Sequence, residues 1–313
     1  MMRLKLVPDT TSIPFMNFRK IAIAGSIVLA LFSAVMFFGV GLNTGIDFEG
    51  GIMIEVKTEG PADIGKMRED LSSLGLGEVA LQEFGAPDDV LIRVERQDGD
   101  SEAQKAAVDL VKSTLNSAFP RIEYRREEFV GPKVSGELVE SALIAVMTAV
   151  VVMLLYIFFR FDWQFSVGAV LALVHDVILT IGFFAVTRIE FNLASVAAIL
   201  TIVGYSINDT VVVYDRVREN LRKYKQMPLT ELLSLTINDT LSRTVMTSAT
   251  TLLALLALFF FGGDVIRGFA AALIWGVVIG TYSSIFIGAP LLLILGLQRS
   301  ERDDSGAEEP EKV

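Results

Sequence analysis

Six long apolar runs constrain this chain more than any other feature of its sequence. They cover residues 21–41, 141–159, 164–187, 191–214, 244–263 and 268–297. A hydrocarbon core about 30 Å thick is crossed by a helix of about 20 apolar residues. The sequence therefore predicts a polytopic α-helical membrane protein with six transmembrane helices. The last run is long enough to tilt, to bend at Pro290 or to extend past the bilayer.

The acidic residues gather in one long segment between the first two runs. Residues 42–140 hold 11 Lys and Arg against 21 Asp and Glu, which accounts for the whole net charge of −10. This balance argues against a basic face that binds nucleic acid. The chain has no Cys, which excludes disulfides, thiol catalysis and thiolate metal sites. We expect one extramembrane domain here, over residues 42–137.

Within this domain, the spacing of apolar residues alternates between strand and helix patterns. Residues 52–57 alternate apolar and polar side chains, as a half-buried strand does. The further predicted strands are 79–84, 90–94 and 121–129, and the predicted helices are 61–74 and 101–119. The order strand–helix–strand–strand–helix–strand predicts a ferredoxin-like α+β fold. Many functions use this fold, so it does not identify the function.

The Lys and Arg residues beside the apolar runs predict the orientation in the membrane. The N-terminal tail and the loop between the fourth and fifth runs are basic, whereas the short loops on the other side carry only Arg188 and Arg267. Basic short loops favour the cytoplasmic side, so we expect both termini there. The predicted divisions are a cytoplasmic tail (1–20), transmembrane helix 1 (21–41), a periplasmic domain (42–137), transmembrane helices 2–6 (138–297) with a cytoplasmic loop (about 216–243), and a disordered cytoplasmic tail (298–313).

Ionisable side chains at membrane depth are costly and usually functional. The third run holds His175 and Asp176, the fourth holds Asn208 and Asp209, and Arg243 begins the fifth. Helical spacing places Asp176 and Asp209 on small, polar faces that can pack together into a polar seam. We hypothesise that Asp209 takes up and releases a proton as it separates from Arg243 and rejoins it.

Simpler roles remain open for the same residues. Asp209 can be a structural, hydrogen-bonded carboxyl, and Arg243 can be a cation that extends to the membrane interface. His175 can orient Asp176 or relay a proton, but as the only histidine it has no imidazole partner for a zinc site. We expect no metal, no cofactor and no catalytic residue, and hence not an enzyme. The enzymatic alternative is an intramembrane aspartyl protease, although the chain lacks a Gly-x-Gly-Asp motif.

Small residues recur at every fourth position along the last run. Gly276, Gly280 and Ser284 lie within this series, which extends over residues 268–288. Such spacing lets two helices approach closely. The pattern predicts a seam of helix packing, and it leaves open whether the facing helix belongs to this chain or to a partner.

Several motifs together resemble the SecF family of bacterial protein-export subunits. The strongest are GIDFEGG at 45–51, after the first run, and YSINDTVVVYDR at 205–216, in the fourth. The NDTLSRT segment at 238–244 and the adjacent His175 and Asp176 add to them. The resemblance covers about residues 18–297, which is nearly the whole chain.

The resemblance implies a fold and an activity. SecD and SecF each provide six helices related by a pseudo-twofold axis, as in resistance–nodulation–division transporters. Together they use the proton-motive force to assist late steps of protein export. At matching positions, the residues assigned to the proton pathway are Asp209, Arg243, Asn208, Asp176 and His175. Those assigned to the hinge and family motif are Gly45, Asp47, Gly50 and Gly51.

The same resemblance implies the surroundings of the protein. We expect SecD as the partner that completes the pair, SecYEG as the translocon, and YajC and YidC as further candidate partners. The unfolded exported polypeptide is expected on the periplasmic side of the bacterial inner membrane. The alternative function is half of a proton-coupled small-molecule transporter of the same superfamily, which a drug-export phenotype unlinked to secretion would favour.

Overall fold

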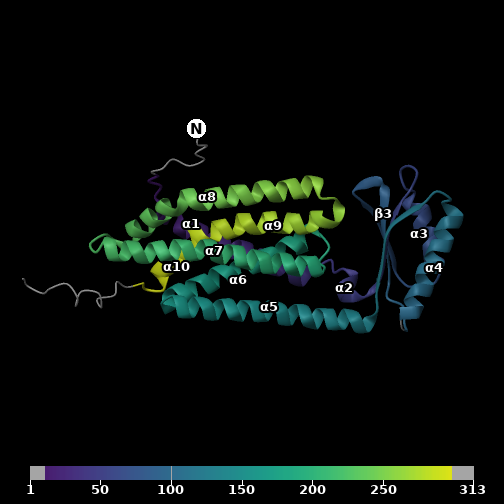
Figure 1. The fold of residues 1–313 in the computed structure, drawn as a ribbon, viewed down its shortest axis with the longest axis horizontal. Helices are drawn as coiled ribbons and strands as arrows, with labels where there is room; N and C mark the ends of the chain where they lie inside the picture. The colour runs from purple at the N-terminus through teal and green to yellow at the C-terminus, as the bar shows by residue number, and fades with distance from the viewer. Residues whose placement is uncertain (1–10, 100, 298–313) are drawn as a thin grey trace, which may run out of the picture.

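The computed structural model describes residues 11–99 and 101–297, which form a long helical bundle with a small α/β domain at one end (Figure 1). The elements in chain order are η1 (Phe15–Phe18), α1 (Arg19–Gly39), α2 (Ile46–Glu49), β1 (Gly51–Lys57), α3 (Ile64–Ser72), β2 (Val79–Phe84), β3 (Ala86–Val94), α4 (Ser101–Ala118), β4 (Glu123–Val130), α5 (Pro132–Arg160), α6 (Trp163–Thr187), α7 (Leu193–Lys223), α8 (Leu229–Phe261), α9 (Asp264–Ser283), η2 (Ser284–Gly288) and α10 (Ala289–Ile294). The predicted tail at 298–313 and the first ten residues of the predicted N-terminal tail lie outside the described residues.

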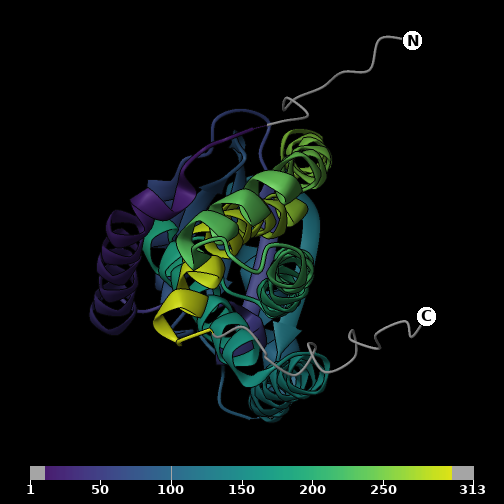
Figure 2. The ribbon, with the colours of Figure 1, turned by 90° about the vertical axis from the view of Figure 1, so that its left-hand side faces the viewer.

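In the described part of the chain, six helices are long and apolar enough to cross a membrane, as the apolar runs predicted. They are α1, α5, α6, α7, α8 and the interrupted helix α9–η2–α10. Helices α6, α7 and α9 form the centre of the bundle, whereas α1, α5 and α8 lie at its periphery (Figure 2). The peripheral helices expose large apolar side chains such as Phe38, Phe159 and Phe261, which suits contact with lipid.

The chain enters the bundle earlier than predicted. Helix η1 begins at Phe15 and leads directly into α1, so residues 15–20 are not part of a tail. Phe15 and Met16 are buried, and the Phe15 ring lies 5.8 Å from the Phe286 ring. The Met16 amide donates a hydrogen bond to the Ser234 hydroxyl (3.3 Å). Burial of these apolar side chains against the bundle lowers the free energy of the folded chain relative to their exposure to water.

The stretch 216–243, which the sequence predicted as a cytoplasmic loop, is helical over most of its length. Helices α7 and α8 extend into this stretch from both sides, so that only residues 224–228 connect them. The Arg216 guanidinium donates twice to Asp239 Oδ2, at 2.9 and 2.8 Å. The polar residues of this stretch therefore pair between two antiparallel helices that continue past the apolar runs.

Pro290 interrupts the sixth transmembrane helix. Proline has no amide hydrogen, and its ring clashes with the carbonyl four residues earlier, at Phe286. Helix α9 therefore gives way to the π-helix η2 directly before Pro290, and the chain resumes as α10. The sequence allowed a bend at Pro290, and the structure shows a π-helical turn over residues 284–288, before this proline.

The α/β domain is a four-stranded antiparallel sheet with two helices on one face. Its strand order is β2-β3-β1-β4. Helices α3 and α4 cover the face away from the bundle (Figure 1), where Met67, Leu71 and Val111 pack with Ile52 and Ile54 of β1. Each such side chain contributes about 1.5–3 kcal/mol when it is fully buried, so the domain has a core of its own. Strand β3 begins earlier than predicted, at the end of a tight turn after β2.

Candidate functional site

The GIDFEGG segment joins the bundle to the domain through a short helix and two glycines. Helix α2 is followed by Gly50 and Gly51, whose φ angles of 75° and 113° lie in the region that favours glycine. Ile46 of α2 packs with Met53 and Leu91 on the face of the sheet opposite α3 and α4. The two predicted hinge glycines therefore lie where the chain turns into β1.

Asp47 connects this segment to the transmembrane helix α7. Its Oδ2 accepts a hydrogen bond from the amide of Leu193, the first residue of α7 (2.9 Å). Asn192 completes the start of the helix, because its Oδ1 accepts from the Ser195 amide (3.1 Å). A carboxylate at this position also lies at the positive end of the helix dipole. Asp47 thus links the hinge to the helix that carries Asp209.

A second group of contacts joins the sheet to the loop between α6 and α7. The Arg93 guanidinium of β3 pairs with the Glu190 carboxylate and donates to Asn43 Oδ1 (3.2 Å). A Cβ atom on Gly45 would overlap the carboxylate end of the Glu190 side chain, so these segments approach each other closely at this position. We call the residues of both groups the domain latch: Asn43, Asp47, Arg93, Glu190 and Leu193.

In the centre of the bundle, Asp176 of α6 is fully buried and contacts three polar side chains. Ser206 Oγ and Ser283 Oγ donate to its Oδ2 at 2.5 and 2.7 Å. His175 Nδ1 lies 3.0 Å from Oδ1, so the two residues of the predicted pair are in contact. Because Ser206 belongs to α7 and Ser283 to α9, this carboxyl group joins the three central helices.

Asp209 lies on α7, one helical turn after Ser206, and is also buried. The Thr244 hydroxyl of α8 donates to its Oδ1 at 2.9 Å. Its Oδ2 has no hydrogen-bond partner within residues 11–99 and 101–297. A buried carboxylate with one uncommitted oxygen can accept a proton there and keep its existing hydrogen bond.

The structure separates residues that the sequence grouped with Asp209. Asn208 and Arg243 are both exposed, on the outer faces of α7 and α8. Among the described side chains, Arg243 and Asp209 form no ion pair within 4.0 Å. The next residue, Thr244, faces the centre instead. Neighbouring helix positions differ by about 100° in direction, so one position decides which side chain is buried.

Hydroxyl groups extend the polar contacts from α7 and α8 to α9. Tyr205 Oη donates to Ser248 Oγ (3.2 Å), which lies 2.7 Å from Thr281 Oγ1. The sequence pattern of α9 predicted packing alone. Uncharged hydroxyls in this apolar run, such as that of Ser283, are the sequence signal for its polar contacts. We define the polar seam as Asp176, Ser206, Asp209, Thr244, Ser248, Thr281 and Ser283.

The small residues of the last run face α7 of the same chain. A Cβ atom on Gly276 would overlap Ile202, and one on Gly280 would lie 3.2 Å from the Ser206 Cβ atom. Ser284 continues this face, since its hydroxyl lies 3.0 Å from a hydroxyl of α7. The close approach of α9 to α7 brings the hydroxyl groups of α9 into the polar seam.

Two family models match the chain over different parts. Protein export membrane protein SecD/SecF, C-terminal, matches residues 110–298, and the SecD/SecF GG motif matches residues 35–62, which include the hinge. The protein translocase subunit SecF of Rickettsia bellii (strain OSU 85-389) is 47% identical over 300 residues, covering 96% of this chain and 98% of that protein. SecF of Rickettsia felis is 48% identical over 292 residues, covering 92% and 94%.

Two solved structures have a similar fold. The crystal structure of SecDF, a translocon-associated membrane protein from Thermus thermophilus, superposes with a TM-score of 0.83 at 36% identity and covers 94% of this chain. A crystal structure of SecDF in a super-membrane-facing form superposes with a TM-score of 0.69 at 36% identity and covers 97% of this chain. The chain spans only 39% and 41% of those two longer chains.

Proposed function

The chain belongs to the SecF family of SecD/SecF protein-export membrane proteins, and we propose that it uses the proton-motive force, together with SecD, to assist protein export by the Sec translocase. In this proposal, a proton taken up at Asp209 shifts the polar seam, and the shift moves the α/β domain. The observation that carries the proposal is that one helix, α7, holds Asp209 in the seam and is capped by Asp47 of the domain latch.

Helix α7 provides a stiff connection between the two sites. Asp209 lies roughly 24 Å from Leu193 along a helix that rises about 1.5 Å per residue. One elementary charge that crosses 100 mV delivers about 2.3 kcal/mol. That energy changes the ratio of two conformations about 50-fold, which is sufficient to bias a domain motion between states of similar energy.

The two solved SecDF structures support a family fold that adopts more than one arrangement. Both are 36% identical to this chain, yet their TM-scores differ, at 0.83 and 0.69. Equal sequence similarity with unequal structural similarity is expected when the parts of one fold move relative to each other. The hinge at Gly50 and Gly51 is a suitable place for such a motion.

We further propose that the α/β domain is ferredoxin-like and periplasmic. The strand order β2-β3-β1-β4, with a helix after β1 and another after β3, supports the topology. Arg160 ends α5, and Arg218, Arg222 and Lys223 belong to the last turns of α7, and these ends of the two helices lie away from the α/β domain (Figure 1). Basic residues favour the cytoplasmic side of a membrane, so both ends of the chain are cytoplasmic in a bacterial inner membrane.

We propose that SecD covers the outer polar face of α7 and α8. Thr201, Asn208, Arg243 and Thr247 are exposed on these helices, and polar groups that face hydrocarbon are costly. This chain corresponds to only 39% of the SecDF chain, which also supports a second set of helices, from SecD, beside this chain. By the family relation, we extend the proposal to SecYEG as the translocon, to YajC and YidC as further partners, and to the exported polypeptide on the periplasmic side.

Photo-crosslinking tests the SecD surface. A photoreactive amino acid in place of Asn208 is expected to crosslink to SecD in membranes, whereas one in place of Phe158, exposed on the peripheral helix α5, is not. Crosslinking to SecD from position 158 but not from position 208 would place the partner elsewhere.

Asp209→Asn tests the proton step. The variant keeps an oxygen acceptor for Thr244 but cannot take up a proton, so we expect normal insertion together with loss of proton-dependent stimulation of preprotein export. Inner-membrane vesicles with and without an ionophore provide the measurement. Asp109→Asn, on the exposed surface of α4, is the matched control and should behave as wild type. Ionophore-sensitive stimulation in the Asp209→Asn variant would refute the proposed role.

A further inference from the structure

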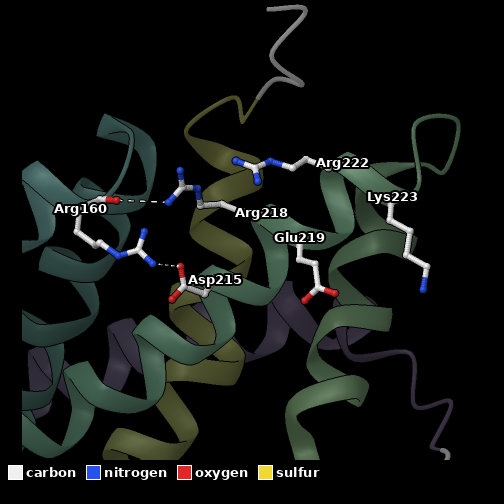
Figure 3. Close-up of a pocket in the computed structure, with 6 residues that line it drawn as sticks. All are labelled: Arg160, Asp215, Arg218, Glu219, Arg222 and Lys223. Atoms are coloured by element: carbon white, nitrogen blue, oxygen red, sulfur yellow. Dashed lines mark hydrogen bonds and ion pairs between the residues drawn. The ribbon is translucent and has the colours of Figure 1, made fainter. Parts of the chain in front are cut away.

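A pocket lined mainly by cations lies at the end of the bundle away from the α/β domain. It has a volume of about 520 Å³ and lies between the end of α5 and the last turns of α7 (Figure 3). Its lining side chains are Arg160, Asp215, Arg218, Glu219, Arg222 and Lys223. We call it the basic pocket, because four of these side chains are basic and two are acidic.

Two arginines of the basic pocket are held in position by the protein itself. Arg160 Nη2 lies 2.8 Å from Asp215 Oδ1, and Arg218 Nη1 donates to the Arg160 carbonyl at 3.3 Å. Both guanidinium groups lie over the Phe161 ring, 4.9 and 5.6 Å from its centre. A fixed, planar guanidinium presents several donors at once, which suits the oxygens of a phosphate group.

The two acidic side chains leave an excess of positive charge in the basic pocket. Asp215 pairs with one cation, Arg160. Glu219 lies 2.6 Å from Arg216 Nη1, which is outside the lining, so its charge is partly offset from outside. An anionic ligand therefore complements the pocket.

The surface beside the basic pocket is aromatic and faces outward. Phe158 and Phe159 at the end of α5 are 61% and 83% exposed, and Trp163 at the start of α6 is 55% exposed. A tryptophan at the end of a transmembrane helix, such as Trp163, is typical of the membrane interface, and Phe158 and Phe159 add apolar surface near it. The basic pocket therefore lies at the level of lipid headgroups, with an apolar surface next to it.

We propose that the basic pocket binds the phosphate headgroup of an anionic phospholipid. The guanidinium groups of Arg160 and Arg218 contact the phosphate, and the acyl chains lie along Phe158 and Phe159. Basic pockets between transmembrane helices on the cytoplasmic side are suited to such headgroups. The apolar surface favours a lipid over free phosphate, which would use only the cations. The bound lipid joins the end of α5 to α7.

Trp163 provides a direct readout of this site. The chain has two tryptophans, so the Trp275→Phe variant leaves Trp163 as the only one. The full-length variant, in neutral detergent, is titrated with brominated phosphatidylglycerol or brominated phosphatidylcholine, whose bromine atoms quench nearby tryptophan. We expect phosphatidylglycerol to bind about 25-fold more tightly, since each cation near an anionic surface contributes roughly fivefold. Millimolar inorganic phosphate should not displace it.

The decisive variant combines Arg160→Gln and Arg218→Gln, which removes the two guanidinium groups proposed to contact the phosphate. We expect it to lose the preference for phosphatidylglycerol and to keep its binding of phosphatidylcholine. Lys105→Gln with Lys133→Gln removes the same charge from exposed positions at the domain end and should leave the preference unchanged. Arg218→Lys keeps the positive charge and should retain most of the preference for phosphatidylglycerol. Thermal melting confirms that each variant is folded.

Three results would overturn the proposal. The first is equal quenching by brominated phosphatidylglycerol and brominated phosphatidylcholine in the Trp275→Phe protein with an unchanged basic pocket. The second is an equal loss of preference in the lysine control, which would indicate general attraction of an anionic lipid to the protein. The third is displacement by inorganic phosphate, which would assign the pocket to a soluble anion.

Discussion

Replacing Asp47 by alanine tests whether the domain latch controls the start of α7. The substitution removes the carboxylate that accepts from the Leu193 amide (2.9 Å). It leaves the Arg93–Glu190 ion pair and the Asn192 cap in place. We therefore expect the α/β domain to remain folded and attached, while the first turn of α7 opens more often.

The expected size of the effect follows from the position of the bond. Loss of a capping side chain costs about 0.5–2 kcal/mol. The Asp47–Leu193 bond is at an exposed position, so water partly replaces it and a value of about 1 kcal/mol is appropriate. That corresponds to a roughly fivefold increase in the opening of the first turn. Asp47→Asn keeps an oxygen acceptor and loses mainly the charge at the helix dipole, about 0.3–1 kcal/mol.

Hydrogen exchange followed by mass spectrometry measures this opening. The peptide that contains Leu193 should exchange about fivefold faster in Asp47→Ala and less than that in Asp47→Asn. Asp63→Ala is the matched control, because Asp63 caps α3 by accepting from the Lys66 amide (3.0 Å). It should affect α3 and leave α7 unchanged.

Export measured in the same Asp47→Ala variant separates coupling from proton transfer. If the latch transmits the motion, stimulation of export falls while proton flux through SecD and this chain persists. Unchanged exchange at the start of α7, or wild-type export in a variant whose first turn opens faster, would refute the reasoning that α7 moves the domain through Asp47.

Three further predictions concern packing, the polar seam and the sheet. Gly276→Val inserts carbon atoms into the α7–α9 contact and should destabilise the bundle by about 1–3 kcal/mol in thermal melts, whereas Gly204→Ala, with only one atom 3.8 Å away, should not. Asp176→Ala removes the acceptor of the buried Ser206 hydroxyl, whereas the Ser283 hydroxyl can still donate to the Gly280 carbonyl (3.1 Å), and the change should cost about 1–3 kcal/mol. The Lys57 ammonium, 2.9 Å from the Asp88 carboxylate, lowers the pKa of Asp88. This ion pair therefore stabilises the α/β domain at pH values above the unfolded-state pKa of Asp88, and the stabilisation is lost as the pH falls through the lowered folded-state pKa. Asp88→Asn should reduce this acid sensitivity in a circular dichroism titration.

The sequence was sufficient for the features that depend on hydrophobicity and on strong local signals. Six spans followed from the length of the apolar runs, because a bilayer imposes one minimum length on every helix. The interruption at Pro290 followed from the missing amide hydrogen of proline. The sequence left open whether His175 orients Asp176 or relays a proton, and in the structure His175 Nδ1 lies 3.0 Å from the buried Asp176 carboxyl.

Features that depend on tertiary pairing were not predictable in the same way. The stretch around Arg216 and Asp239 is polar enough to suggest a loop, yet its side chains bond to each other between two helices. Ser283 lies beside the predicted packing series without belonging to it, and only the packing of α9 against α6 brings its hydroxyl to Asp176. In both cases a single chain segment gives no information about which polar group will face it.

The opposite orientations of Asp209 and Arg243 indicate how a partner enters the proposed proton step. Thr244 holds Asp209 toward the centre, whereas Arg243, one position earlier, projects from the outer face of α8. A cation that faces hydrocarbon is costly, and the proposed pairing with SecD would provide polar groups beside Arg243. Under the proposed pairing, SecD surrounds Arg243 while Asp209 keeps its uncommitted oxygen inside the bundle. Proton uptake and contact with SecD then act on opposite faces of the same two helices, α7 and α8, which couples them directly.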